Sequence, residues 1–159
     1  MTAIHPQAQI GHIHLTVADL DRAEKFYTEI LGFEVTSRFS QHAVFLSAGG
    51  YHHHIALNTW AGPNAKPPPP ESTGLYHFAI LLPSRLELAK VIKRVIDCQV
   101  QIDGASDHHV SQAVYLRDPD GNGIELYVDR DPSEWIYQDG ELVMTVDPLD
   151  LSELLAELS

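Results

Sequence analysis

Three residues of the sequence, His12, His77 and Glu125, have the types and the placement to hold a divalent metal ion. Each lies in a short stretch where apolar and polar residues alternate, which is typical of a β-strand. Because successive side chains of a strand point to opposite faces, each of the three is expected on the face away from its apolar neighbours. The sequence therefore predicts that all three face one cavity.

This donor set indicates a class of metals. Two imidazoles and one carboxylate on one side of an ion leave its other positions open, an arrangement that suits non-haem Fe(II). The same donors also bind Mn, Ni and Zn, so the set does not select one metal. The alternative is that three separate polar residues only line a wet cleft, but that would not explain why equivalent places in a repeat carry ligands.

The repeat consists of the strands that carry these residues and the helices between them. A strand at 11–17 is followed by a helix that Asp19 caps and Gly32 ends, and then by strand candidates near 33–39, 42–48 and 52–60. The same order returns as a strand at 76–82, a helix from Ser84 to about Asp97, and strand candidates near 99–102, 111–117 and 123–128. The order βαβββ thus occurs twice, about 65 to 70 residues apart. This predicts an α+β fold in which two βαβββ modules pair around a central cavity.

The paired domain is expected to span residues 8–128, with module one at 8–60 and module two at 75–128. The segment 61–74 between them contains four consecutive prolines, Pro67 to Pro70, which favour an extended linker.

Residues 129–159 are expected to form a C-terminal extension with a hairpin around Asp139-Gly140 and a helix that starts at Asp147-Pro148. One face of this helix carries a leucine stripe, which either covers an edge of the core or contacts another subunit: Leu151, Leu154, Leu155 and Leu158.

Composition limits the partners. The chain has 22 acidic and 10 basic residues and a formal net charge of −12, which would repel phosphate backbones, so no nucleic-acid partner is expected. No apolar run reaches the roughly 20 residues that span a bilayer, and the first residues lack the features of a signal peptide. The single cysteine, Cys98, excludes an internal disulfide and a cysteine zinc site. We therefore expect a cytoplasmic protein without a membrane partner.

Three stretches of the chain, at 12–20, 26–33 and 118–126, resemble the vicinal oxygen chelate superfamily. That superfamily includes glyoxalase I, bleomycin- and fosfomycin-resistance proteins, and extradiol ring-cleaving dioxygenases. The resemblance implies paired βαβββ modules with metal ligands at His12, His77 and Glu125. Enzymes like glyoxalase I have a fourth ligand at the module-one equivalent of Glu125. Here that place holds Ala56, so a three-ligand site is implied.

Within the superfamily, the segments 49–60 and 74–83 look most similar to bacillary catechol 2,3-dioxygenase-like proteins. This similarity implies an extradiol dioxygenase that uses Fe(II), or Mn(II), to cleave a catechol-type substrate with O₂. His54 would act as acid and base, Tyr115 would hydrogen-bond the substrate, and His108 or His109 would be a further histidine beside them.

Other interpretations stay open. A lyase, isomerase or antibiotic-modifying transferase could use Zn or Ni only as a Lewis acid, and a resistance protein could bind a small molecule without catalysis. His54 could be merely a polar strand end, and Tyr115 a core tyrosine. A homodimer is expected because one pair of modules leaves sheet edges and the leucine stripe exposed. His12 and Glu125 of one site could then come from one chain or from two.

Overall fold

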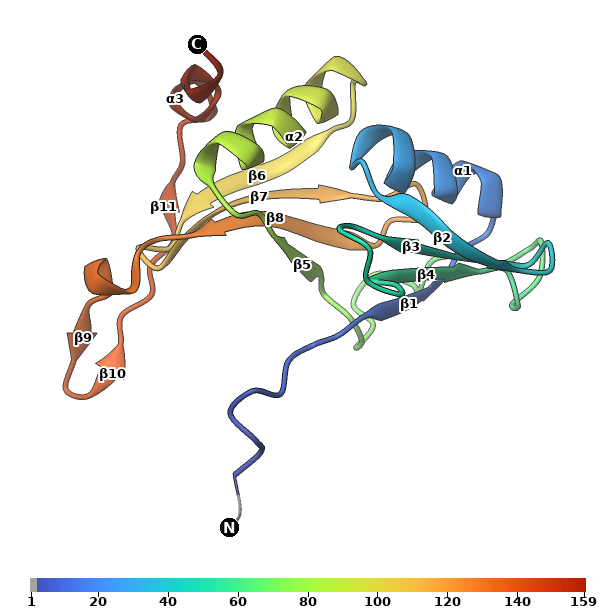
Figure 1. Ribbon diagram of the computed structural model, residues 1–159, viewed down its shortest axis with the longest axis horizontal. Coiled ribbons are helices and arrows are strands. Elements are labelled where there is room, and N and C mark those ends of the chain that lie inside the picture. The colour runs from blue at the N-terminus through green and yellow to red at the C-terminus, as the bar shows by residue number, and fades with distance from the viewer. Residues whose placement is uncertain (1–2) are drawn as a thin grey trace.

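The computed structural model describes residues 3–159 and contains two larger β-sheets whose helices lie on one side (Figure 1). The first sheet has the strand order β1-β4-β3-β2, with the bounds β1 Ile13–Thr16, β2 Glu34–Phe39, β3 Ala43–Ser47 and β4 Ile55–Asn58. Between β1 and β2 the chain forms α1 (Leu20–Lys25), which continues as a π-helical turn at Phe26–Ile30. Strand β1 runs parallel to β4, and the other neighbours are antiparallel.

The second sheet repeats this order. Its strands follow the order β11-β6-β7-β8-β5, with the bounds β5 Phe78–Leu81, β6 Ile102–Asp107, β7 Ser111–Arg117, β8 Gly123–Asp129 and β11 Asp147–Pro148. Helix α2 (Arg85–Asp97) connects β5 to β6, and β5 runs parallel to β8. The predicted α+β fold of two βαβββ modules is therefore confirmed.

Local sequence explains where the helices begin and end. The side chain of Asp19 accepts a hydrogen bond from the Arg22 N–H, and Ser84 caps α2 by accepting one from the Glu87 N–H. Gly32 has a φ of +89°, a left-handed conformation that glycine adopts without strain, and it ends the first helical segment. The apolar stripe of α2 is buried against the sheet, and it consists of Leu88, Ala89, Val91, Ile92 and Val95.

The strand register shows which positions of the two modules are equivalent. Ile13 lies opposite Ile55 in the β1–β4 pair, and Phe78 lies opposite Ile124 in the β5–β8 pair. The residues that follow the two isoleucines are Ala56 and Glu125. The structure thus places an alanine in module one where module two has a carboxylate.

The turn between β7 and β8 fastens the two modules together. The Tyr27 hydroxyl donates to Asp118 Oδ2 over 2.9 Å, and both side chains are buried. Asp120 Oδ1 accepts hydrogen bonds from the Ala18 N–H and from the Arg22 guanidinium, each over 2.9 Å. These contacts join residues about one hundred positions apart in the sequence, so they fix how module two sits on module one.

One predicted strand is wrong. The strand expected near 99–102 starts too early, because Gln99 still belongs to the turn after α2, where its N–H donates to the Ile96 carbonyl and its φ is +56°. The strand begins at Ile102 and continues to Asp107 as β6. His108 therefore lies at the end of a strand, directly before the turn into β7.

The predicted start of the C-terminal helix is also wrong. Asp147–Pro148 is the short strand β11, which pairs with β6, while Asp150 caps α3 (Leu151–Leu155) by accepting the Ser152 N–H over 2.7 Å. Leu154 is fully buried where α3 lies beside α2, Leu151 and Leu155 are partly buried, and Leu158 stays 39% exposed, so most of the leucine stripe covers the core, as one of the two expectations had it (Figure 1). A hairpin of β9 (Tyr137–Gln138) and β10 (Glu141–Leu142) precedes β11.

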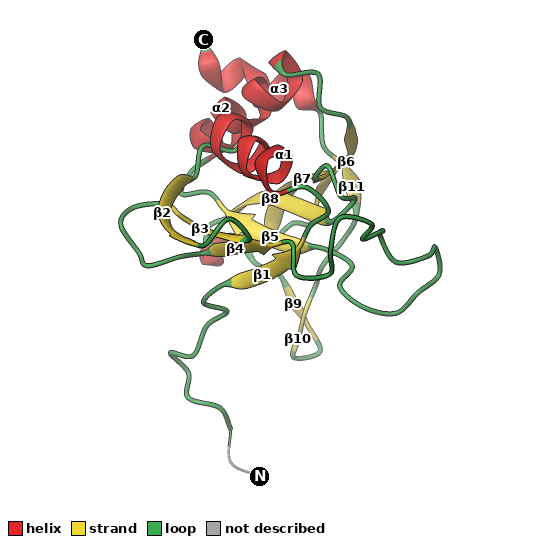
Figure 2. Ribbon diagram, turned by 90° about the vertical axis from the view of Figure 1, so that its right-hand side faces the viewer, coloured by secondary structure: helices red, strands yellow, loops and turns green. Residues whose placement is uncertain are grey.

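The helices leave the other face of both sheets open. Figure 2 shows α1, α2 and α3 stacked on one side and the β9–β10 hairpin on the opposite side. Short one-turn 3₁₀ helices at Pro132–Glu134 and Ala156–Leu158 complete the extension. Within residues 3–159, no helix has the length and apolar character needed to cross a membrane.

Candidate metal centre

The best-formed part of the candidate site is the pair of His77 and Glu125. His77 directly precedes β5, and Glu125 lies in the neighbouring strand β8. The His77 Nε2 and Glu125 Oε2 atoms are 2.9 Å apart, and the side chains are 30% and 13% exposed. An imidazole nitrogen and a carboxylate oxygen that converge at an accessible place are suitable donors for a divalent cation.

A glycine permits this approach. A Cβ atom at Gly123 would collide with the Tyr76 carbonyl oxygen and would lie 3.0 Å from the Cβ of His77. Any larger residue at 123 would therefore push the start of β5 away from β8. Gly123 thus contributes to the position of His77 relative to Glu125.

His12 lies on the module-one side of a cavity that His77 also lines, whereas Glu125 is not among the residues that line it. It directly precedes β1, is exposed, and packs its ring against His53 with the ring centroids 4.4 Å apart. His12, His54 and His77 all line one cavity of about 980 Å³ at the seam between the modules. In the arrangement of residues 3–159, however, no three His, Cys, Asp or Glu side chains lie close enough to hold one ion. The structure thus brings two of the three predicted ligands together and places the third across the cavity.

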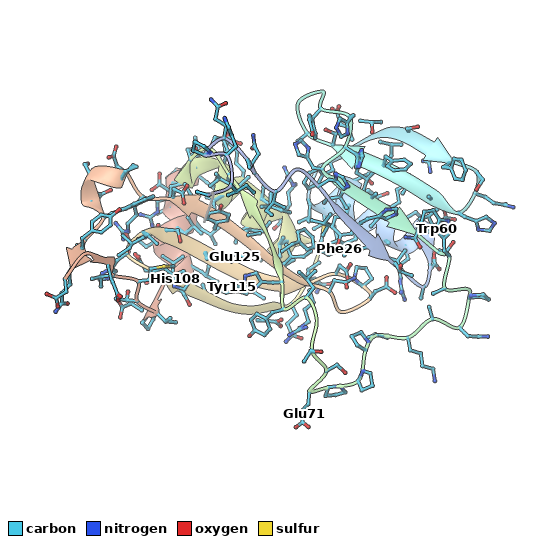
Figure 3. All side chains as sticks on the ribbon, turned by 90° about the horizontal axis from the view of Figure 1, so that it is seen from below. Phe26, Trp60, Glu71, His108, Tyr115 and Glu125 are labelled. Carbon is cyan, nitrogen blue, oxygen red and sulfur yellow. The ribbon has the colours of Figure 1, made fainter. Side chains whose placement is uncertain are left out.

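Tyr115 lies in β7 and His108 directly follows β6, and Figure 3 shows both on the same sheet as Glu125. The Tyr115 hydroxyl lies 2.6 Å from His108 Nε2 and 3.5 Å from Glu125 Oε1. Burial, followed by the charge of Glu125 and its hydrogen bond, raises the pKa of Tyr115 to about 12. The phenol therefore stays protonated near neutral pH and has two acceptors within reach, a nitrogen of His108 and an oxygen of Glu125.

The two adjacent histidines after β6 have different surroundings. His108 is half-buried and contacts Tyr115, whereas His109 is exposed and pairs its Nε2 with Asp147 Oδ2 over 2.9 Å. His109 has a φ of +64°, so the chain turns sharply between the two side chains. Of the two candidates from the sequence, the structure brings His108 to Tyr115.

His54 is held by hydrogen bonds at one ring nitrogen. The Ala48 N–H donates to His54 Nδ1 over 3.3 Å, and the buried Ser47 hydroxyl lies 3.1 Å from the same atom. Because a backbone N–H can only donate, Nδ1 acts as an acceptor and the proton of the neutral ring is on Nε2. His54 also lines the cavity at the seam, and in its neutral form Nε2 is the ring nitrogen that can donate a hydrogen bond.

Two features of the site were not predicted from the sequence. His53 packs against His12, and burial together with the neighbouring imidazoles, His12 first, lowers the pKa of His53. The run from His52 to His54 could have pointed to it. Thr145 lies in the C-terminal extension, and its carbonyl oxygen is 2.6 Å from His108 Nδ1. No local sequence pattern indicates this second contact.

Comparisons with known proteins agree with this architecture. The superfamily described as Glyoxalase/Bleomycin resistance protein/Dioxygenase matches residues 9–126. A catechol-2,3-dioxygenase of Bacillus subtilis (strain 168) is 43% identical over 159 residues, which is 99% of this chain and 54% of that protein. A biphenyl-2,3-diol 1,2-dioxygenase 3 of Rhodococcus globerulus is 29% identical over 76% of this chain and 63% of that protein. The match thus spans 54% and 63% of the length of these two relatives.

Solved structures show the same fold. A glyoxalase/dioxygenase from Nostoc punctiforme has a TM-score of 0.66 at 21% identity and covers 82% of this chain and 99% of its own. A lactoylglutathione lyase from Agrobacterium tumefaciens has a TM-score of 0.59 at 23% identity and covers 78% of this chain and 96% of its own. From its sequence match and its fold, the chain belongs to the glyoxalase/bleomycin resistance protein/dioxygenase superfamily.

Proposed function

We propose that the protein is a metal-dependent extradiol dioxygenase that cleaves the ring of a catechol-type substrate with O₂. The observation that carries this proposal is the continuous group formed by His77, Glu125, Tyr115 and His108, in which a pair of metal donors adjoins a protonated phenol and an imidazole. The similarity to a protein named catechol-2,3-dioxygenase, at 43% identity, supports the same reaction class.

His12, His77 and Glu125 are the residues that would hold the metal. Their donor set fits a divalent ion because it combines two neutral imidazoles with a carboxylate and leaves other positions free. Fe(II) is the proposed metal, with Mn(II) able to replace it. When bound, such an ion supplies a Lewis acid for the catechol oxygens and a redox centre for O₂.

The surrounding side chains would handle protons. Tyr115 stays protonated near neutral pH. Its hydroxyl oxygen would accept a proton from a substrate hydroxyl while its own proton passes to His108 Nε2, 2.6 Å away. His54 carries its proton on Nε2 and would return a proton from the module-one side of the cavity. An acid and a base would thus act from opposite sides of the site.

His12 would complete the site as the third ligand, paired with the His77 and Glu125 of its own chain or of a second chain. We propose that the protein is a homodimer in solution. The free edge of β5 and the residues before it expose Leu75, Tyr76 and Leu81, which are 64%, 84% and 53% accessible. Clustered apolar surface of this kind usually has a partner. A monomer mass by light scattering at micromolar concentration would rule out the dimer.

The reaction is tested by loading the metal-free protein anaerobically with Fe(II), then adding catechol and air. Ring cleavage is expected to produce a yellow product with uptake of O₂, and the same protein loaded with Zn should be inactive. Full turnover with Zn or Ni and without O₂ would instead favour a lyase or isomerase. An iron-loaded protein that binds catechol but consumes no O₂ would contradict the proposal.

A further inference from the structure

We propose that the backbone carbonyl of Thr145, in the C-terminal extension, fixes the tautomer of His108 and so makes His108 a proton acceptor for Tyr115. Thr145 lies beyond residues 9–126, the part that matches the superfamily. The inference concerns a positioning residue and rests on the proposed function for its catalytic meaning. Its structural content can be tested without the reaction.

The geometry at His108 determines where the ring proton lies. The Thr145 carbonyl oxygen is 2.6 Å from His108 Nδ1. A carbonyl can only accept, so the proton of the neutral imidazole must be on Nδ1. The other nitrogen, Nε2, then has a free lone pair, and it lies 2.6 Å from the Tyr115 hydroxyl. Tyr115 therefore donates to His108.

The opposite tautomer would reverse this bond. With the proton on Nε2, His108 would donate to the Tyr115 oxygen, and the phenol proton would have to point to Glu125 Oε1, 3.5 Å away. Tyr115 would then donate its hydrogen bond to Glu125, a proposed metal ligand. The tautomer of His108 thus decides whether the phenol of Tyr115 is hydrogen-bonded to a base or to the metal-binding carboxylate.

The Thr145 carbonyl is held in place from several sides. The Thr145 N–H donates to the His108 carbonyl over 3.2 Å, so backbone and side chain of His108 are both bonded to the same residue. The Thr145 hydroxyl donates to Asp147 Oδ2 over 2.9 Å. Immediately afterwards, β11 pairs with β6, with Asp147 opposite Asp107. The pairing of β11 with β6, the strand that ends directly before His108, therefore positions the carbonyl.

The sharpest test weakens this one carbonyl and leaves every side chain in place. Replacing Val146 by its α-hydroxy acid turns the 145–146 amide into an ester, whose carbonyl is a poorer acceptor. The matched control is the same replacement at Met144, which weakens the carbonyl of Val143. Thr145→Pro is a second, genetically encoded variant that removes the N–H donated to His108.

The primary readout is the pair of nitrogen-15 shifts of the His108 ring in the metal-free protein, at about pH 8.5, where an ordinary imidazole is neutral. The resonances are assigned by their loss in His108→Gln. In the unmodified protein, Nδ1 should be protonated and Nε2 should not. The ester at 146 should lower the ratio of this tautomer to the other by about fivefold, the factor that a weakened hydrogen bond typically gives, whereas the ester at 144 should leave it unchanged.

Two results would overturn the proposal: a proton on Nε2 of His108 in the unmodified protein, or an unchanged tautomer ratio in the 146 ester. Steady-state kinetics test whether the tautomer of His108 matters for catalysis. In the iron-loaded protein the 146 ester should lower kcat and leave KM and metal content unchanged. If no ring cleavage occurs in any preparation, the proposed function fails, but the tautomer measurement still decides whether Thr145 positions His108.

Discussion

Replacing Tyr27 by phenylalanine tests the contact that fastens module two to module one. The Tyr27 hydroxyl donates to Asp118 Oδ2 over 2.9 Å, and the two residues are 0% and 5% exposed. Burial, followed by the charge and hydrogen bond of Asp118, raises the pKa of Tyr27 far above its usual value, so the phenol stays a donor at every ordinary pH. Water cannot replace the lost bond at such a buried site.

The magnitude follows from the kind of bond. A hydrogen bond to a charged group contributes about 1.5–3 kcal/mol. Asp118 Oδ2 would keep the bond from Asn122 Nδ2 at 2.8 Å, so the carboxylate would not be left without a partner and the loss should stay within that range. For a chain of this length, such a loss lowers the melting temperature by about 3–12 °C.

Urea unfolding monitored by circular dichroism measures this loss. Tyr137→Phe is the matched control, because Tyr137 is 62% exposed and exposed substitutions usually change stability by less than about 0.5 kcal/mol. If Tyr27→Phe destabilises the protein no more than Tyr137→Phe, the buried bond does not hold the modules together, and the reasoning is refuted.

Three further substitutions test two residues of the site and one ion pair of the fold. His54→Ala should retain the metal but lose turnover by about 10²- to 10⁴-fold, the usual contribution of a positioned acid–base group; loss of metal in elemental analysis would show that His54 is a ligand. Tyr115→Phe should lower kcat by about 10²-fold with the metal content unchanged, and unchanged steady-state rates would remove Tyr115 from the mechanism. Asp107→Asn should cost about 1–3 kcal/mol at neutral pH, because it breaks a part-buried ion pair with Arg130; equal urea midpoints would contradict this.

The pH dependence of the Asp107 effect has a definite sign. Burial opposes ionisation of Asp107, but hydrogen bonds from Arg130, Gln112 and the His109 N–H outweigh it and hold the pKa well below its usual range. A carboxyl whose pKa is lowered in the folded state stabilises the fold at pH values above its pKa in the unfolded chain, which is about 3.9. The stability difference between the protein and Asp107→Asn should therefore be full at neutral pH and shrink as the pH falls below about 4.

Much of the site could be predicted because it depends on strand alternation. His77 and Glu125 each lie between or beside apolar residues that face the helices, and this pattern places both on the open face. The equivalence of Ala56 and Glu125 likewise follows from matching the two isoleucines that precede them, and the strand register agrees with it.

The features that could not be predicted depend on contacts between distant parts of the chain or on local backbone conformation. The sequence around Asp118 indicates a turn, but nothing in it shows that the carboxylate reaches Tyr27 across the module boundary. The choice between His108 and His109 depends on the left-handed conformation of His109, which a sequence pattern does not specify. The role of Thr145 depends on β11 pairing with β6, whereas Asp147-Pro148 looks locally like a helix start.

The metal content of the protein after anaerobic loading with Fe(II) tests the central claim most directly. Elemental analysis should find a single iron per chain in the unmodified protein, and its loss in His12→Ala, His77→Ala and Glu125→Ala, because two remaining ligands hold a divalent ion poorly. His14→Ala is the matched control, since His14 lies in β1 two residues after His12 but is not a proposed ligand, and it should retain the iron. Full iron occupancy in His12→Ala would show that the pair of His77 and Glu125 binds the metal without module one, and would contradict the three-ligand site.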